Sequence, residues 1–274
     1  MRAQPSDPGT QPVGSRGQQL FLIARDDPRD GALEAAATEQ GFIAHRLGLL
    51  ETEPGSDVGR LTAWLKAPPE RAAVAWTSRR AAQALAATIP SRRGALEALP
   101  LFALGGESAA PIAAAGLRVD LPKSGLGAEH LAAHIAARAA RLGIRSVLAL
   151  QGDRPLPGLV DGLRAAGLTT ETLEVYRIRF LKPDVREIVE AMAEARVAAA
   201  AFFSPSGVEA LERLLEPGVC ARFRTEVVAL ARGETTYHAL VDRGYHRAMV
   251  PDPLETPFEA FAQRTLSQFR CKSR

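Results

Sequence analysis

The sequence predicts an α/β protein made of two similar domains, each with a parallel sheet covered by helices. Short apolar runs alternate with alanine-rich helical stretches along the 274 residues, which is typical of parallel α/β layers. The segment 77–85 (TSRRAAQAL) recurs 126 positions later as 203–211 (FSPSGVEAL), and Gly41 and Gly167 keep the same spacing. Solenoid and propeller repeats are far shorter. The long period therefore indicates duplicated domains, which we expect to face each other across a ligand-binding cleft.

Short apolar runs are predicted to form the strands of the two sheets. Each run ends in a polar or glycine-bearing turn that leads into a helical pattern. The runs are 20–24, 72–77, 101–104, 146–150, 198–203 and 226–230. Ligands of parallel α/β sheets bind beyond the carboxyl ends of the strands, so the residues that follow these runs are candidates for a binding site. They are Arg25, Ser78, Gly105, Gly152, Ser204 and Gly233.

One segment departs from this alternation. Residues 173–180 (LEVYRIRF) have a long two-residue period, and the matching region of the first repeat is 47–54. We expect these two segments to pair as a two-stranded β-ladder that links the domains. The chain would then build domain one discontinuously from 19–46 and 181–274, and domain two from 55–172.

Composition argues against several classes of protein. The apolar stretches are too short to cross a bilayer, so no membrane span is expected. Residues 1–18 are rich in proline and glycine without an apolar core, which predicts a flexible tail and not a secretory signal. Cys220 and Cys271 lack C-x-x-C spacing, which favours a reducing compartment and hence the cytoplasm. His130 and His134 lie four apart without the glutamate of H-E-x-x-H, so no metal site is predicted.

The charged residues favour an acidic small molecule as the ligand. Arginine greatly outnumbers lysine at a net charge of +3, and guanidinium groups suit the recognition of carboxylates and phosphates. The basic residues are scattered without interleaved aromatics, which argues against nucleic acid. No P-loop or G-x-G-x-x-G pattern follows a strand, so ATP and NAD are disfavoured. No G-x-S-x-G elbow supports a serine hydrolase.

Two serines and one tyrosine each allow two interpretations. Ser78 and Ser204 open helices after apolar strands, where serine is an ordinary N-cap. The same helix N-termini, with those after Gly105 and Gly233, could instead present free N–H groups to an anion, and both roles can hold at once. Tyr176 is either a half-buried strand aromatic or a phenol that donates a proton to a departing group.

Short motifs together resemble the uroporphyrinogen-III synthase family over the chain from Leu20 onward. They are FFSPSG at 202–207, GETT at 233–236, VYR at 175–177 and TSRRA at 77–81, in the order and spacing of the family. The resemblance implies two α/β lobes joined by a two-stranded ladder. It also implies a reaction without cofactor or metal. Linear hydroxymethylbilane, which carries eight carboxylates, loses its terminal hydroxyl and closes with inversion of the last pyrrole ring to give uroporphyrinogen III.

The family pattern also implies roles for individual residues. Tyr176 would assist departure of the hydroxyl. The pattern places in the substrate cleft Ser78, Arg80, Ser108, Ser204, Ser206, Gly207, Thr235 and Thr236. The strand-end residues Arg25, Gly105 and Gly152 complete the predicted substrate site. We expect a monomer of tetrapyrrole biosynthesis that makes transient contact with the preceding pathway enzyme.

Some positions depart from the family pattern. Ser108 replaces a threonine and keeps the hydroxyl, whereas Gln151 replaces the first arginine of a family loop. Gly48 and Arg79 stand where proline is frequent. These departures concern carboxylate contacts and leave Tyr176 unchanged. Two alternatives stay open: a non-catalytic relative that binds a tetrapyrrole or another polyanion, and a hinged two-domain binding protein for small anions.

Overall fold

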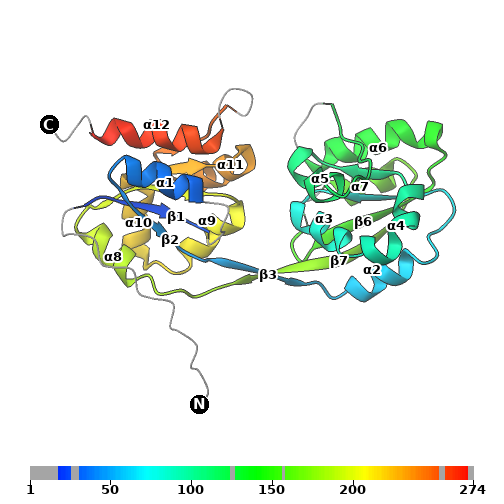
Figure 1. Ribbon diagram of the computed structural model, residues 1–274, viewed down its shortest axis with the longest axis horizontal. Coiled ribbons are helices and arrows are strands. Elements are labelled where there is room, and N and C mark those ends of the chain that lie inside the picture. The colour runs from blue at the N-terminus through cyan, green and yellow to red at the C-terminus, as the bar shows by residue number, and fades with distance from the viewer. Residues whose placement is uncertain (1–17, 26–30, 124–126, 156–157, 253–256, 271–274) are drawn as a thin grey trace, which may run out of the picture. The chain divides into compact units, whose positions relative to one another are not determined.

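The protein folds into two compact units, shown by a computed structural model (Figure 1). The structure describes residues 18–25, 31–123, 127–155, 158–252 and 257–270. Unit 1 is built from both ends of the chain, Met1–Glu51 and Phe180–Arg274, and unit 2 is Thr52–Arg179. The tail predicted for 1–18, except Gln18, and Cys271 lie outside the described residues.

Unit 1 contains a five-stranded sheet in the order β10-β9-β8-β1-β2, in which all neighbouring strands are parallel. Its strands are β1 (Leu20–Ile23), β2 (Ile43–Arg46), β8 (Val197–Phe202), β9 (Val228–Ala231) and β10 (Ala248–Met249). Successive side chains of a strand point to opposite faces, so both faces of this apolar sheet need a cover.

Two groups of helices supply that cover in unit 1. The face of Phe21 and Ile23 packs on α1 (Gly31–Glu39) and α12 (Phe258–Arg270). The face of Leu20 and Leu22 packs on the other four helices. They are α8 (Arg186–Ala193), α9 (Pro205–Glu212), α10 (Pro217–Glu226) and α11 (Glu234–Asp242).

Unit 2 repeats this plan around a sheet in the order β3-β7-β6-β4-β5, parallel from β7 to β5. The strands are β3 (Leu50–Pro54), β4 (Ala72–Trp76), β5 (Leu101–Ala103), β6 (Ser146–Gly152) and β7 (Thr169–Phe180). One face packs on α6 (Ala128–Leu142) and α7 (Leu159–Ala165). The other packs on α2 (Val58–Trp64), α3 (Arg79–Ala86), α4 (Ile89–Ala98) and α5 (Gly106–Ala113).

The sequence repeat is a structural repeat in register. In unit 1, Leu20 of β1 pairs with Ile43 of β2, and in unit 2 Ser146 of β6 pairs with Thr169 of β7, each 126 positions later. The glycines that precede β2 and β7, at positions 41 and 167, have φ values of 83° and 77°, a left-handed turn that glycine adopts without strain. The duplicated α/β architecture predicted from the sequence is therefore correct.

The two segments predicted as linker strands lie in the sheet of unit 2. The strand β3 is the neighbour of β7 at the sheet edge, and β7 also pairs with β6 through its first part. Gly55, directly after β3, allows the chain to approach the backbone of β7 closely, because a β-carbon at this position would lie 2.6 Å from the backbone nitrogen of Tyr176. The strand β2 was not predicted, because its sequence IAHR is short, of mixed polarity and only partly buried.

Candidate active site

The carboxyl ends of the strands gather the predicted residues within each unit. In unit 2, Ser78 follows β4, Gly105 follows β5 and Gly152 ends β6, and these three strands are neighbours. In unit 1, Ser204 follows β8 and Arg25 follows β1, also adjacent strands. In each sheet, the carboxyl ends of the strands are thus followed by turns and by the N-termini of helices.

The two predicted serines are N-caps in equivalent positions. The Ser78 hydroxyl accepts a hydrogen bond from the Ala81 backbone nitrogen at 3.1 Å. The Ser204 hydroxyl accepts one from the Gly207 nitrogen at 3.2 Å. The capping interpretation is therefore correct for both, and it leaves other first-turn N–H groups directed beyond the strand ends, where a helix favours negative charge.

The helices α5 and α11 occupy equivalent positions in the two units, and each begins at a glycine. Gly105 and Gly233 are the N-caps of α5 and α11, both in extended backbone conformation. The Ser108 hydroxyl accepts a hydrogen bond from the Gly105 nitrogen at 3.0 Å and donates one to its carbonyl oxygen at 2.8 Å. Ser108 and Thr236 are only 6% and 4% exposed, whereas Thr235 is exposed. Ser108 therefore shapes the turn that begins α5. At the start of α11, Thr235 carries the exposed hydroxyl and Thr236 is buried.

Tyr176 lies in a small cavity at the carboxyl end of the unit 2 sheet. The cavity holds about 50 Å³ and is lined by Thr77, Ser78, Gln151, Gly152, Arg154, Pro155, Leu159 and Tyr176. A bulge between Gln151 and Gly152 shifts the register so that Gly152 pairs with Tyr176. The phenol ring sits against the Gly152 backbone, since a β-carbon there would lie 2.8 Å from the phenol oxygen. Of the predicted residues, the cavity brings together Tyr176, Ser78 and Gly152.

The remaining predicted residues do not line this cavity; three of them, Arg25, Arg80 and Ser206, follow the carboxyl ends of β1, β4 and β8. Arg80 donates from Nε to the Thr52 hydroxyl at 3.1 Å. The Arg25 guanidinium stacks over the Phe203 ring, 3.8 Å from its centroid, which fixes its position by a cation–π contact. Ser206 and Gly207 form the first turn of α9, and Gly207 is buried against the Ser204 cap.

Sequence reasoning missed Arg79, the first residue of α3. Its Nε is buried and has no hydrogen-bond partner in the described part of the chain. A buried guanidinium N–H without a partner is destabilising, so an acceptor brought by a ligand would stabilise it. The signal in the sequence was the position of an arginine directly after an N-cap serine. Gln151 and Arg154, which line the Tyr176 cavity, were also left out of the predicted set.

The two arginines that follow Tyr176 on β7 each have a carboxylate partner. Arg177 donates to Glu174, and this hydrogen bond raises the pKa of Arg177 and lowers the pKa of Glu174. Arg179 pairs with Glu53 on β3 at 2.7 Å. Both arginines therefore have carboxylate partners, and they brace the strand that carries Tyr176.

The described residues also give two negative results. Among them, no three His, Cys, Asp or Glu side chains are grouped as ligands of a metal ion. No helix in the described ranges is long and apolar enough to span a bilayer.

Comparison with known proteins gives a family and a fold. The profile of the family described as uroporphyrinogen-III synthase HemD matches residues 31–256. A mutant uroporphyrinogen III synthase from Thermus thermophilus is 20% identical, with a TM-score of 0.67 over 92% of this chain and 99% of that one. The uroporphyrinogen-III synthetase of Helicobacter pylori is 15% identical, with a TM-score of 0.53 over 94% of this chain and 100% of that one. No curated protein matches by sequence.

At these sequence identities the solved structures establish only the fold. Membership of the family rests on the match to the family profile. The profile includes the motifs around Ser78, Tyr176 and Ser204 and reaches into both units. The chain therefore belongs to the uroporphyrinogen-III synthase family of enzymes, which act on a small-molecule substrate.

Proposed function

We propose that this protein closes linear hydroxymethylbilane to uroporphyrinogen III with inversion of the terminal pyrrole ring, as a cofactor-independent hydro-lyase. Family membership supports the reaction class. The observation that carries the proposal is the position of Tyr176, whose phenol lies in a cavity with the Ser78 cap and the Gly152 backbone. Tyr176 lies within β7, and its phenol is beside Gly152 at the carboxyl end of β6, where substrates of parallel α/β sheets bind.

The substrate carboxylates are held by backbone N–H groups and by arginines. In unit 2 the helices α3 and α5, and in unit 1 the helices α9 and α11, begin at the carboxyl ends of their own sheets, where first-turn N–H groups and the positive end of the helix dipole favour an anion. Arg79 adds a buried donor without a partner in the described residues. Positioning the ends of a flexible chain lowers the entropy barrier to ring closure, and we assign much of the catalysis to this effect.

Tyr176 acts as the general acid for the leaving group. Its phenol donates a proton to the terminal hydroxyl, the carbon–oxygen bond breaks with its electron pair on oxygen, and water departs. The methylene carbon left on the first ring is attacked by the substituted α-carbon of the last pyrrole, which gives a spiro intermediate. The bond between that α-carbon and its methylene bridge then breaks, and the free α-carbon of the same pyrrole attacks the released bridge carbon, which closes the macrocycle with the ring inverted. A ring proton is released on final closure and returns to the phenolate, so the net change is loss of one water.

The same proposal includes the setting of the enzyme. We infer that the protein acts as a monomer in the cytoplasm, where it receives the unstable linear tetrapyrrole by transient contact with the preceding enzyme of the pathway. The small number of cysteines, with Cys220 buried as a free thiol, supports a reducing compartment.

A product assay tests the function. The purified chain is added to a mixture that generates hydroxymethylbilane, and the oxidised uroporphyrins of type I and type III are separated by chromatography. Dominance of type III is expected. If only type I forms, as in spontaneous closure, the protein is a non-catalytic binding relative, and its affinity for the tetrapyrrole becomes the quantity to measure.

The assigned acid is tested in the same assay with Tyr176→Phe. We expect a lower turnover with retained fold and product affinity, because the variant lacks only the hydroxyl. Tyr237→Phe, at a partly buried position in unit 1, is the matched control and should leave the rate unchanged. An unchanged rate for Tyr176→Phe would remove this residue from the mechanism.

A further inference from the structure

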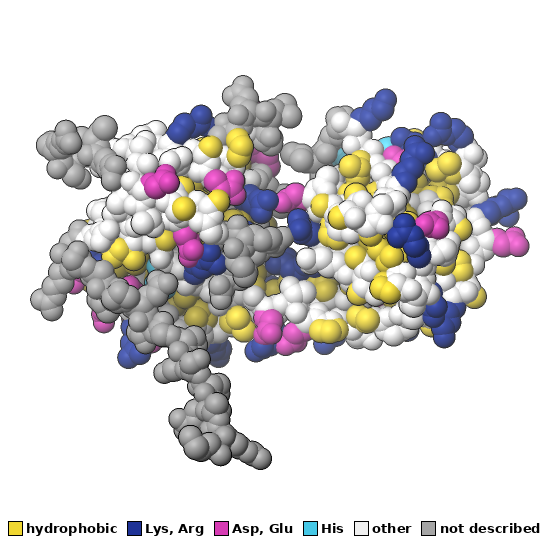
Figure 2. All heavy atoms as spheres, in the orientation of Figure 1, with side chains coloured by type: hydrophobic (Ala, Val, Ile, Leu, Met, Phe, Trp, Pro, Cys, Tyr) yellow, Lys and Arg dark blue, Asp and Glu magenta, His cyan; other side chains and the backbone are white. Residues whose placement is uncertain are grey.

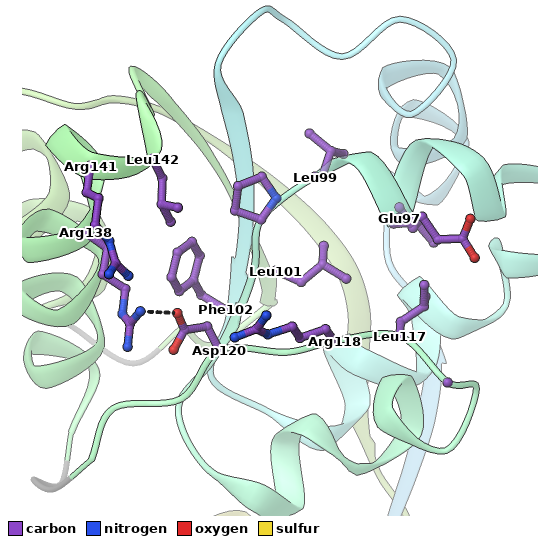
Figure 3. Close-up of a pocket in the computed structure, with 13 residues that line it drawn as sticks. Glu97, Leu99, Leu101, Phe102, Leu117, Arg118, Asp120, Arg138, Arg141 and Leu142 are labelled. Atoms are coloured by element: carbon purple, nitrogen blue, oxygen red, sulfur yellow. Dashed lines mark ion pairs between the residues drawn. The ribbon is translucent and has the colours of Figure 1, made fainter.

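A cavity in unit 2 lies at the other end of the sheet from the candidate active site. It has a volume of about 550 Å³ and lies where β5 begins and α6 ends (Figure 3). The residues that line it come from α4, the start of β5, the segment before Asp120, and the end of α6. The volume falls in the range of small-molecule sites. Ser78, Gly105, Gly152 and Tyr176 do not line it.

The floor of this cavity is apolar. Leu101 and Phe102 are 3% and 0% exposed and belong to the core of unit 2. Leu142, at the end of α6, is 44% exposed, which is unusual for a large apolar side chain in the described part of this protein. Figure 2 shows apolar side chains bordered by basic ones on the visible face of unit 2. Leu101 and Phe102 are covered by the fold, so the apolar surface open to a ligand comes from Leu99 and Leu142.

Three arginines surround the cavity, and two of them carry unbalanced charge. Arg138 pairs with Asp120 at 2.9 Å, a contact drawn in Figure 3. Arg118 and Arg141 make no hydrogen bond or ion pair with any residue that the structure describes. The carboxylate of Glu97, also in the lining, is paired with Arg93 at 2.8 Å and points away from the three arginines (Figure 3). The cavity therefore has a net positive side.

The duplicated fold supplies an internal comparison. Unit 1 has a cavity of about 380 Å³ at the equivalent place, because α12 packs on its sheet where α6 packs in unit 2. Its lining is Val228, Arg247, Met249, Thr265, Gln268 and Phe269. Along the aligned helices, Thr265, Gln268 and Phe269 stand in place of Arg138, Arg141 and Leu142.

The arginine in the lining of the unit 1 cavity is bound within its own unit. Arg247 stands in the place of Arg118, but it donates to the Glu226 carbonyl oxygen at 2.8 Å. Phe269 packs edge-on against Phe42, with ring centroids 6.1 Å apart. Unit 1 therefore forms the equivalent cavity without a cluster of free arginines. The arginines around the unit 2 cavity are accordingly not required by the fold.

We infer that the unit 2 cavity binds a small organic carboxylate with an apolar body. The carboxylate lies between Arg118 and Arg141, whose planar guanidinium groups form paired hydrogen bonds with such anions. The apolar body lies against Leu99 and Leu142, whose side chains are at least partly exposed. The site is separate from the proposed reaction, and a failure of either proposal leaves the other standing.

A titration with 2-naphthoate tests the site, with neutral 2-naphthamide as the matched probe. Calorimetry and nuclear magnetic resonance shifts follow binding to the whole protein. Saturable binding of 2-naphthoate is expected with a dissociation constant on the order of 1 mM or tighter for a ligand of this size. The shifts should centre on Arg118, Asp120 and Leu142, and 2-naphthamide should bind at least about tenfold more weakly because it lacks the charge.

Variants separate the site from general surface charge. The double variant Arg118→Gln with Arg141→Gln should weaken 2-naphthoate binding about tenfold or more, since both charge-assisted pairs are lost. Arg247→Gln in the equivalent unit 1 position is the control and should change nothing. Thermal melting confirms that the variants fold, and type III formation should stay as in the unchanged protein. No saturation, equal binding of both probes, or equal loss in the control variant would overturn the inference.

Discussion

The Tyr176 ring lies directly on the backbone of Gly152, with no space for a β-carbon between them. A β-carbon built at position 152 would lie 2.6 Å from Cε2 and 2.8 Å from the phenol oxygen of Tyr176. Gly152 is buried at the end of β6 and Tyr176 is on the adjacent strand β7. The glycine therefore sets the position of the phenol in the cavity.

Gly152→Ala should lower turnover while the protein stays folded. The methyl group must push the phenol aside, and misplacement of a reacting group by about 1 Å can lower a rate on the order of a hundredfold. The effect is expected mainly in kcat, measured by type III formation. Gly94→Ala in α4 is the control, because a β-carbon there meets nothing within 4 Å. Full activity of Gly152→Ala would show that the ring position does not matter.

Arg79→Gln should raise the KM for hydroxymethylbilane more than it lowers kcat. The buried Nε of Arg79 lacks a partner in the described residues, and a substrate carboxylate would provide one. Loss of a charge-assisted hydrogen bond corresponds to a KM increase of about tenfold or more. Arg145→Gln, an exposed position before β6, should leave KM unchanged. Equal KM values for both variants would exclude Arg79 from substrate binding.

The duplication made most of the fold predictable from the sequence. The N-cap serines at 78 and 204 and the turn glycines at 41 and 167 depend on local backbone geometry, which the residue type reports directly. The edge strand β2 is half-buried and mixed in polarity, so no periodic signal marks it.

Part of the site depends on contacts that local patterns do not report. The position of Tyr176 on Gly152 results from a bulge in the pairing of two strands, which a single sequence does not show. The buried state of Ser108 and Thr236 and the unpartnered Nε of Arg79 follow from packing between helices and sheet. The sequence therefore predicted which residues lie at the strand ends, and the structure shows which hydroxyls are used by the fold.

The paired caps should contribute similar stability in the two units. Ser78→Ala and Ser204→Ala each remove one hydrogen bond to a first-turn nitrogen and should lower the free energy of unfolding by about 1 kcal/mol. Replacement by glycine should have a smaller effect. Urea unfolding followed by circular dichroism measures this, with Ser56→Ala as the control, because Ser56 is exposed and only its backbone nitrogen makes a hydrogen bond with the described residues. A loss no larger than in the control would contradict the capping role.

A buried tyrosine should make unit 1 sensitive to alkaline pH. Tyr245 is 5% exposed, and its ring contacts Phe202 and Phe223. Burial is the main cause that raises the pKa of its phenol above the ordinary value of 10.0, and the Glu212 carboxylate raises it further. The pKa of the nearby Cys220 thiol is also raised, again mainly by burial.

The sign of the pH effect follows from these directions. A phenol whose pKa is higher in the folded state stabilises the fold fully below the unfolded pKa, and this contribution is lost as pH rises above about 10. The melting temperature of the unchanged protein should therefore fall between pH 9 and 11. Tyr245→Phe should flatten this fall, because a phenylalanine has no proton to lose, and Tyr237→Phe should not. An equal alkaline fall in Tyr245→Phe would assign the effect to Cys220 or to other groups, and a Cys220→Ser variant would then distinguish them.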